Sequence, residues 1–482
     1  MIDTQAIRSK ILNLAMRGKL TEQLPEDGTA EELYRQIQAE KQALIKAGKI
    51  KKEKPLPEIA DGEVPFEIPK NWKLCRFGTV ITLVSGTDYA PEEYNDEGRG
   101  VPYITGASNL LSEGVLINRW TEKPRCMANF GDVLLVCKGS GYGKVAMCDI
   151  GEAHIARQIM AVKKTSFLEM RFLLYFLMAN FNYLKDKGQG LIPGVDRKSV
   201  LNMLFLIPPL AEQHRIVARI EQAFSLLDTI DALQAKYADN LAVLKSKLID
   251  AAIQGKLTEQ LPEDGTAEDL YRQIQAEKQA LIKAGKIKKE KPLPEIAADE
   301  VPFEIPKSWK WVSLGNITSK ISSGNTPPGG SKSDVYVPSG FPLFREQNIY
   351  DDGIHQAGMV FISEQLLETR QNSTVKANDI LLNITGGSIG RCSLVPNDFD
   401  RGSINQHILI IRTVEPETRF YIHMLIRSSY IQSHIKNKAV GDKDGFSGGR
   451  CKRMLVPLPP LTEQKRIVAK LEELLPLCER LK

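Results

Sequence analysis

The chain contains one segment of 56 residues twice. Residues 18–73 and 255–310 are identical at 52 of 56 aligned positions, at a constant offset of 237 residues. A repeat with this spacing is far too long for a solenoid unit, and it indicates two whole domains, each accompanied by its own copy of one connector. Such a protein presents two similar surfaces, which suits a ligand that is itself long and repetitive.

Length and composition set the outer limits. A chain of 482 residues is too long for one core, so two or three domains are expected. The net charge of +5 permits an acidic partner such as nucleic acid but does not require one. The seven cysteines form no CxxC pair, and no apolar run is long enough to cross a membrane. We therefore expect a cytoplasmic protein with free thiols.

The repeated segment itself reads as a helical connector. Thr29 and Glu32 form a capping box, with a weaker version in the second copy, and a helix is predicted over 30–47 with Gly48 as its stop. Four lysines between Lys49 and Lys54 precede two prolines. This basic stretch is either a solvated linker or a strap that contacts phosphates.

Apolar residues spaced alternately four and three apart connect the two halves. This heptad seam continues for about five repeats, and Gln234 interrupts it. It predicts a central helix of about 40 residues, about 60 Å long, which needs a partner to cover the seam. The predicted seam residues are Ile216, Ile220, Leu227, Ile230, Tyr237, Leu241, Leu244 and Leu248.

The two ends of the chain supply that partner. Residues 459–475 repeat 208–224, and residues 6–20 repeat 243–257, so the terminal helices placed end to end rebuild a copy of the central one. The repeat is circular, and antiparallel pairing would give a pseudo-two-fold molecule with a domain near each end. The alternative is two unrelated amphipathic helices on separate domains. The terminal seam residues are Ile7, Ile11, Leu14, Ile467, Leu471 and Leu474.

The two remaining segments read as one α+β domain present twice. Their apolar runs are short, β-branched and bounded by Gly, Asn and Pro, as strands are. DVLLVCKGSGYGKVAM aligns with DILLNITGGSIGRCSL, VPYITGASNL with FPLFREQNI, and HIARQIMAV with SINQHILII. The connectors match far better than the domains, as expected if the domain surfaces meet different targets. Recent duplication of the connector alone would leave the same pattern.

The fold class expected from these features is α+β, with two similar domains joined by long antiparallel coiled-coil helices in a circularly permuted, pseudo-two-fold arrangement. The expected divisions are an N-terminal helix (1–20) completing the distal coiled coil, a helical connector with a basic proline-containing linker (21–63), a first globular domain (64–207), the central long helix (208–257), the second connector (258–300), a second globular domain (301–456) and a C-terminal helix (457–482).

Motifs for catalysis are not found in the sequence. The loop Gly139–Lys144 lacks the Walker spacing, because Lys138 and Val145 stand where Gly and Ser or Thr are needed. There is no G-x-G-x-x-G after a strand, and no Asn-Pro-Pro-aromatic or Asp-Pro-Pro-Tyr segment. The six histidines lack metal-ligand spacing. We expect no catalytic residue, cofactor or metal in this chain.

The whole chain resembles the DNA specificity subunit of type I restriction-modification systems. The resemblance is carried by the circular repeat, by the PPL-x-EQ-x-RIV-x-(R/K) starts at Pro208 and Pro459, and by the GDVLL/NDILL, GSGYGK/GSIGR and NQH segments. It implies that each domain reads one half of a bipartite asymmetric site in double-stranded DNA. The helices would set the spacer and dock two methyltransferase subunits, and restriction/translocase subunits would join. The first domain departs from the pattern, with Ala156-Arg157-Gln158 opposite Asn405-Gln406-His407.

Candidate DNA contacts are sought in the polar, Gly-rich segments beside the strands, where arginine can pair with guanine and Asn or Gln with adenine. For each, the alternative is a solvated loop or a turn cap, and Tyr89 and Tyr142 can pack rather than stack. In the first domain they are Thr87, Asp88, Tyr89, Tyr94, Asn109, Lys138, Tyr142, Lys144, Arg157 and Gln158. In the second they are Asn325, Thr326, Lys332, Arg345, Gln347, Asn348, Ser388, Arg391, Asn405 and Gln406, with Lys443, Lys452 and Arg453 as later basic candidates.

Three other functions compete with this interpretation. One is a stand-alone DNA-binding scaffold, architectural or regulatory, that works without enzymatic partners. Another is an adaptor whose paired domains bind protein or glycan, against which a steep loss of binding with salt would argue. The third, a stand-alone methyltransferase, is disfavoured by the missing cofactor motifs.

Overall fold

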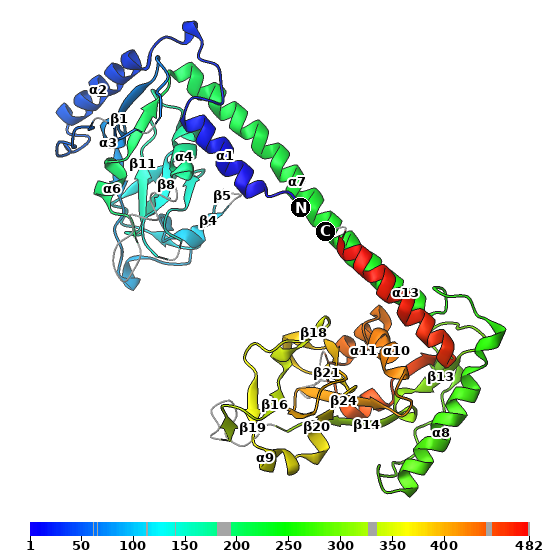
Figure 1. Cartoon of the computed structure of the whole chain (residues 1–482). Coiled ribbons are helices and arrows are strands. Elements are labelled where there is room, and N and C mark those ends of the chain that lie inside the picture. The colour runs from blue at the N-terminus through cyan, green and yellow to red at the C-terminus, as the bar shows by residue number, and fades with distance from the viewer. Residues whose placement is uncertain are drawn as a thin grey trace. The chain divides into compact units, whose positions relative to one another are not determined.

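The computed structural model describes residues 1–60, 62–64, 66–111, 114–139, 141–180, 194–325, 335–439 and 446–480. The chain divides into two compact units, Met1–Gln234 and Ala235–Lys482 (Figure 1). Each unit combines a globular α+β part with a connector helix and a helix from one end of the chain. The predicted α+β class, present twice, is therefore confirmed.

The first unit contains two small four-stranded sheets. One has the order β2-β11-β8-β9 and is antiparallel throughout, and the other has the order β6-β3-β10-β7, with β10 parallel to β3. All eight residues of β8 and β11 are buried, so these two apolar runs form the centre of the core. The strands are β1 (Lys73–Arg76), β2 (Leu83–Ser85), β3 (Val101–Ile104), β4 (Leu110–Leu111), β5 (Gly114–Val115), β6 (Trp120–Thr121), β7 (Met127–Asn129), β8 (Val133–Val136), β9 (Val145–Met147), β10 (Glu152–Ile155), β11 (Ile159–Val162) and β12 (Leu204–Ile207), and the short helices are α3 (Phe77–Val80), α4 (Met170–Ala179) and α6 (Arg197–Leu201).

The second unit repeats this topology strand for strand. Its sheets have the orders β14-β24-β21-β22 and β15-β19-β16-β23-β20, where β23 is parallel to β16 and β15 is an added edge strand. The segments aligned from sequence fall on equivalent strands: β3 and β16, β8 and β21, β11 and β24. The strands are β13 (Lys310–Ser313), β14 (Thr318–Ser323), β15 (Tyr336–Val337), β16 (Phe341–Phe344), β17 (Ile349–Tyr350), β18 (Gly353–Ile354), β19 (Val360–Ile362), β20 (Thr374–Lys376), β21 (Ile380–Asn383), β22 (Cys392–Leu394), β23 (Arg401–Ile404), β24 (Ile408–Thr413) and β25 (Leu455–Leu458), and the helices are α9 (Glu364–Glu368), α10 (Thr418–Ile426), α11 (Ser429–Ala439) and α12 (Gly448–Lys452).

The connector helices are α2 (Ala30–Lys46) and α8 (Ala267–Lys283), close to the predicted bounds. The capping prediction is reversed. Thr29 makes no side-chain capping bond, whereas the Thr266 hydroxyl accepts a hydrogen bond from the Asp269 amide at 3.2 Å and donates one to its carboxylate at 2.6 Å. Glu32 instead accepts from Gln36 one turn later. The sequence preference for glutamate in this box therefore gave the wrong order.

A helix of 44 residues, α7 (Leu210–Ile253), runs through the junction between the units. In the first unit α1 (Thr4–Met16) lies antiparallel to it, because Thr4 bonds Asp231 at 2.6 Å while Thr21, after the helix, bonds Glu212 at 3.2 Å (Figure 1). In the second unit α13 (Leu461–Arg480) is antiparallel to the other end of α7. There Glu479 pairs with Lys245, and Glu463 accepts from Thr258.

The predicted seam is covered only in part. Ile216, Ile220, Leu227, Leu241, Ile467 and Leu471 are buried, and Ile11, Leu14, Ile230, Leu248 and Leu474 are half-buried. Three members are wrong as core residues: Ile7 is 37%, Tyr237 42% and Leu244 43% exposed. On α1 the face towards the core is instead formed by Leu12 and Ala15. A strict 3.5-residue repeat drifts around a helix of 3.6 residues per turn, which accounts for the mismatch.

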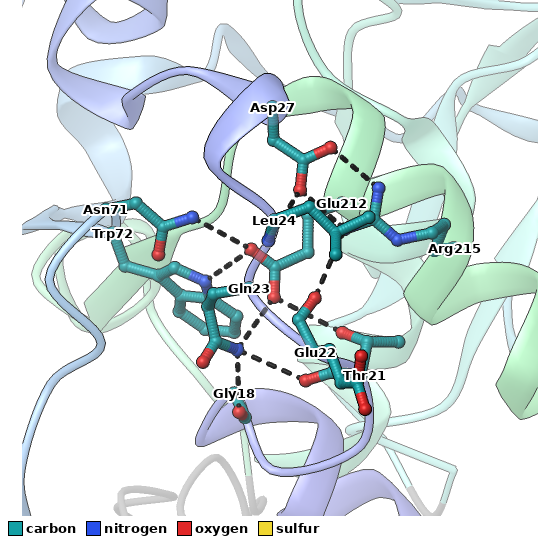
Figure 2. Close-up of polar contacts among 10 residues, drawn as sticks. All are labelled: Gly18, Thr21, Glu22, Gln23, Leu24, Asp27, Asn71, Trp72, Glu212 and Arg215. Carbon is teal, nitrogen blue, oxygen red and sulfur yellow. Dashed lines mark hydrogen bonds and ion pairs between the residues drawn. The ribbon is translucent and has the colours of Figure 1, made fainter.

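A buried carboxylate fastens each connector to the start of a long helix. Figure 2 shows Glu212 of α7 surrounded by donors: the Trp72 indole nitrogen lies 2.9 Å away, the Gln23 amide nitrogen 3.0 Å and the Thr21 hydroxyl 3.2 Å. The neighbouring Arg215 binds Asp27 at 2.7 Å and holds the pKa of that carboxyl below its usual range. All of these groups recur in the second unit, where Glu463 accepts from Trp309, Gln260 and Thr258, and Arg466 binds Asp264.

Candidate nucleic-acid interface

Four polar segments of the first unit meet at one end of its two sheets. Arg157, in the turn between β10 and β11, binds Asp88 twice, through its amide at 3.0 Å and through Nε at 3.2 Å. Lys144 donates to the Ala107 carbonyl at 3.3 Å. Gln158 lies against the other two loops, since a Cβ atom at Gly106 or at Gly139 would stand 3.0 or 3.5 Å from its Oε1.

The exposed members of this cluster form what we call the first loop face. Its residues are Thr87, Asp88, Lys138, Lys144, Arg157 and Gln158. All six were predicted as DNA contacts, and the structure brings them together at the same end of the unit. Their chemistry, three cations with hydroxyl, amide and carboxylate groups, is that of a surface able to bind phosphates and read base edges. Whether they contact DNA stays a prediction.

In each unit, a glycine after the first strand of the antiparallel sheet lets the backbone pass close to the turn that follows β10 or β23. A Cβ atom at Gly86 would lie 2.1 Å from the Ala156 carbonyl oxygen, and one at Gly324 would lie 2.0 Å from that of Ile404. No other residue fits so close to backbone. The close approach places Thr87 and, in the second unit, Asn325 directly after it, on the loop face.

Two predicted contacts of the first unit are corrected because their side chains are buried. Asn109 is 1% exposed, and its Oδ1 accepts from the Thr105 and Gly106 amides at 3.0 and 3.2 Å. Tyr89 is 8% exposed, and its hydroxyl donates to the Lys123 carbonyl. Neither side chain is exposed for contact with a base in this structure. Tyr94 and Tyr142 are half-buried, and Tyr142 packs against the core, the alternative that the sequence left open.

Sequence reasoning missed the role of His154. Its ring lies 4.3 Å from that of Tyr89, its Nδ1 accepts from the Arg125 and Cys126 amides, and its Nε2 donates to the Thr87 carbonyl at 2.9 Å. Because Nδ1 accepts two hydrogen bonds, the imidazole is neutral, and burial lowers its pKa. This histidine fixes the backbone of the loop that carries Thr87 and Asp88. The six scattered histidines gave no sign of it.

The second unit has an equivalent cluster, which we call the second loop face. It is formed by Asn325, Arg345, Gln347, Ser388, Arg391 and Gln406, all exposed or half-exposed. Glu346 links the loops, since its carboxylate accepts from Asn405 at 2.9 Å and its carbonyl accepts from Asn383 at 2.9 Å. Arg391 lies over the Tyr350 ring at 4.7 Å, which orients its guanidinium.

Two predictions in the second unit are corrected in the same way. Asn348 is fully buried, and its Nδ2 donates to the carbonyls of His355 and Ala357 at 3.0 and 3.1 Å. Asn405 is 6% exposed and holds Glu346 and the His407 amide. Asn109 and Asn348 have equivalent structural roles. The aligned asparagine of GASNL and REQNI was the signal that could have identified them as loop supports.

Lys452 and Arg453 are the basic candidates that lie away from the second loop face. Lys452, at the end of α12, binds Glu290 of the second connector at 2.5 Å, and the exposed Arg453 follows it. The structure therefore does not place these two with the loop face. Thr326, Lys332 and Lys443 lie outside the described residues.

Over the described ranges, no group of three or more His, Cys, Asp or Glu side chains is arranged to hold a metal ion. The helices in those ranges are all too short or too polar to cross a membrane. All seven cysteines are unpaired, and burial raises the pKa of Cys75 to about 12 and that of Cys137 to about 11. These two thiols are therefore poor nucleophiles.

Comparison with known proteins connects this geometry to a family. The family model described as "Type I restriction modification DNA specificity domain" matches residues 69–236 and 306–481. The EcoAI specificity subunit of the type I restriction enzyme from Escherichia coli is 28% identical over 99% of this chain and 90% of its own length. The EcoEI specificity subunit from the same species is 27% identical with the same coverage. A solved structure from work on "complex assembly" and "conformational transition of the type I R-M system" shares the fold, with a TM-score of 0.57, 19% identity, and coverage of 87% of this chain and 93% of that one.

Proposed function

We propose that this chain is the sequence-specific DNA-binding subunit of a type I restriction-modification system. The premise is that the chain belongs to the family of type I restriction modification DNA specificity domains and contains two copies of that domain. Each loop face reads one half of a bipartite, asymmetric site in double-stranded DNA. Two methyltransferase subunits and the restriction/translocase subunits are the other partners. The chain works in the cytoplasm, where its unpaired cysteines stay reduced.

One observation supports this most: the same strands present different side chains. Arg157 in the first unit and Gln406 in the second occupy the same position of the turn after the parallel strand pair, and both are exposed. Arginine suits guanine, and glutamine suits adenine, in the major groove. The scaffold therefore repeats while the readout differs, as an asymmetric site requires.

The contacts of the exposed side chains indicate how the first loop face would read DNA. Asp88 accepts from both the amide and the Nε of Arg157, which holds the Nε edge of the guanidinium, and no described residue pairs with the remaining guanidinium donors. Such preorganisation reduces the entropy lost on binding. Lys138 and Lys144 are exposed on the same face, and such cations can position the phosphates.

The helices are assigned the spacing and docking roles. Support comes from the antiparallel contacts of α1 and α13 with α7 within their own units, which suit the proposed pseudo-two-fold coiled coil. Apolar side chains remain exposed on α7, with Leu226 62% and Leu233 60% exposed in the first unit, and Val243 52% exposed in the second. Exposed apolar residues on a helix suit burial against a partner. The methyltransferase subunits are the proposed occupants.

The proposed recognition domains are residues 64–207 and 301–456. Replacing 64–207 with the corresponding domain of a relative should change one half of the modified site and leave the other half intact. Methylated adenines mapped across a genome, with and without the chain, would show both halves. A change in both halves would contradict modular reading.

A stand-alone DNA-binding scaffold is the second candidate. It predicts tight, sequence-specific binding by the purified chain without any methyltransferase. The favoured proposal predicts that methyltransferase subunits are needed for tight specific binding. A titration of one labelled duplex with the chain, with and without those subunits, separates the two.

A further inference from the structure

A strongly basic groove lies in the second unit, away from the loop face. Its volume is about 640 Å³, and it separates α8 and the basic linker from the edge of the antiparallel sheet. Its lining includes Lys278, Lys286, Lys288, Lys320, Lys376 and Arg412. We call it the basic groove.

Among the described residues, carboxylates balance only part of the positive charge in this groove: Glu290 pairs with Lys452 and Glu368 with Arg401. Lys320 on β14 lies directly across from Arg412 on β24, and Arg412 is already bound to Asp379 at 2.6 Å. Among the described residues, Lys320 donates to the carbonyls of Gln371 and Thr374, at 3.2 and 3.3 Å. Within the described residues neither Lys320 nor Lys376 forms an ion pair with a carboxylate. Burial and the nearby charge of Arg412 lower the pKa of Lys320 to about 8, and Asp379 offsets only part of this shift.

The first unit shows that the fold does not need these cations. Lys320 lies opposite Arg412 in the strand pair of the second unit. Thr82 has the equivalent position in the first unit, because its carbonyl accepts from the amide of Lys163, the counterpart of Arg412. The pairs Lys376–Arg401 and Asn129–Glu152 also occupy equivalent register positions. Three groove positions are therefore basic in the second unit and neutral or acidic in the first. The flanking ion pair is kept in both units, as Arg412–Asp379 and Lys163–Asp132.

The groove lies within reach of a duplex that crosses the second loop face. Asn325 of that face follows the same strand that carries Lys320, five residues away. An extended strand rises about 3.3 Å per residue, so the two positions are roughly 17 Å apart. Successive phosphates of one DNA strand advance by about 3.4 Å along the axis, so this span equals about five base pairs.

We infer that the basic groove binds backbone phosphates of the DNA beside the half-site read by the second loop face, a contact that the first unit does not make. This inference rests on the proposed function. The groove adds affinity that does not depend on base sequence, so the second half-site is held more tightly and with a steeper dependence on salt. The basic linker then acts as a phosphate-contacting strap in this unit.

The test uses a double variant of the full chain, K320T/K376N. Arg401 is left unchanged, because it pairs with Glu364 and Glu368. Dissociation constants for a cognate and a non-cognate duplex are measured over a series of salt concentrations, with the methyltransferase subunits present. Loss of two phosphate contacts should lower the slope of log affinity against log salt by about two, with unchanged half-site preference. The reciprocal variant T82K/N129K should raise that slope.

Each result has a distinct meaning. An unchanged slope for a folded K320T/K376N chain would overturn the inference. If inorganic pyrophosphate then raised the melting temperature of the wild type but not of the variant, the groove would bind free phosphate compounds instead of DNA. A wild-type complex without any sequence preference would overturn the proposed function. In that case a slope difference on the non-cognate duplex would still support the groove.

Discussion

At the turn between β10 and β11 the first unit carries Arg157, where the turn between β23 and β24 carries Gln406. The difference predicts a change of readout at one base pair. R157Q should shift the preference of the first half-site from guanine to adenine at one position, because glutamine pairs bidentately with adenine. The lost guanine contact should cost about 1–3 kcal/mol of discrimination. Affinities for duplexes that vary only at that base pair would measure it.

The matched control for this change is Q406R in the second unit. It should alter one position of the other half-site and leave the first half-site intact. If R157Q lowered affinity equally for all duplexes, Arg157 would be a phosphate contact and not a base reader.

The buried Glu212 gives a second prediction for single residues. W72F removes one hydrogen-bond donor from a fully buried carboxylate, which should lower the free energy of unfolding by about 1.5–3 kcal/mol. Urea unfolding would measure the change. W309F provides the equivalent change at Glu463 in the second unit. A loss below 0.5 kcal/mol, on the order of a surface substitution, for both variants would show that the indoles merely fill space.

Lys320 should lower the free energy of unfolding of this chain. Its charge is half-buried and faces Arg412 across the strand pair, so K320T should raise the free energy of unfolding by about 0.2–1 kcal/mol at pH 7. The folded-state pKa of about 8 lies below the ordinary value of 10.5. The unfolded chain therefore binds more protons between those values, and the advantage of K320T should shrink as pH rises through that window. Urea titrations at pH 7 and pH 10 would test both statements.

Single residues were the hardest level to predict from sequence. The polar side chains of the Gly-rich loops stay predicted DNA contacts, and of these Asn109, Asn348 and Asn405 are buried and hold the loops from within. Composition cannot separate a buried asparagine from an exposed one, since both types favour turns. The burial of His154 depends on long-range packing against Tyr89 and Tyr103, which no local pattern records.

Among the elements, α1 best separates heptad spacing from actual packing. The heptad spacing predicts Ile7 as a core residue, but Ile7 is 37% exposed, whereas Leu12 is 5% exposed. L12A should therefore lower the free energy of unfolding by about 2–5 kcal/mol, as expected for a core cavity. I7A should change it by about 0.5 kcal/mol or less. Equal effects of the two variants in urea unfolding would restore the heptad assignment.

The elements themselves were largely predictable. The connector helices, the long central helix and the principal strands follow from spacing and β-branched runs. The extra edge strand β15 and the short strands β4, β5, β17 and β18 did not, because two-residue pairings depend on their neighbours more than on their own sequence. The capping boxes at α2 and α8 were predicted in the wrong order for the same reason, because whether Thr29 or Thr266 makes its capping bond depends on the surroundings of each side chain.

For the whole molecule, the circular repeat leads to a mechanical prediction. If α7 sets the distance between the half-sites, a four-residue insertion after Gln234 adds about one turn, or 6 Å. The preferred spacer should lengthen by about two base pairs, because each contributes about 3.4 Å, and neither half-site should change. Methylation mapping with the insertion variant would show the new spacing.

A four-residue insertion after Gly48, outside the long helix, is the matched control and should leave the spacer as it was. An unchanged spacer with the α7 insertion would mean that the helix does not act as a ruler. A changed half-site would mean that α7 also shapes the loop faces. The outcome depends on α1 and α13 keeping their antiparallel contacts with α7, since Thr4–Asp231 and Lys245–Glu479 lie on either side of the insertion point. Loss of modification at every spacing, with Leu12 and Ile467 still buried, would place the defect in methyltransferase docking instead of in DNA reading.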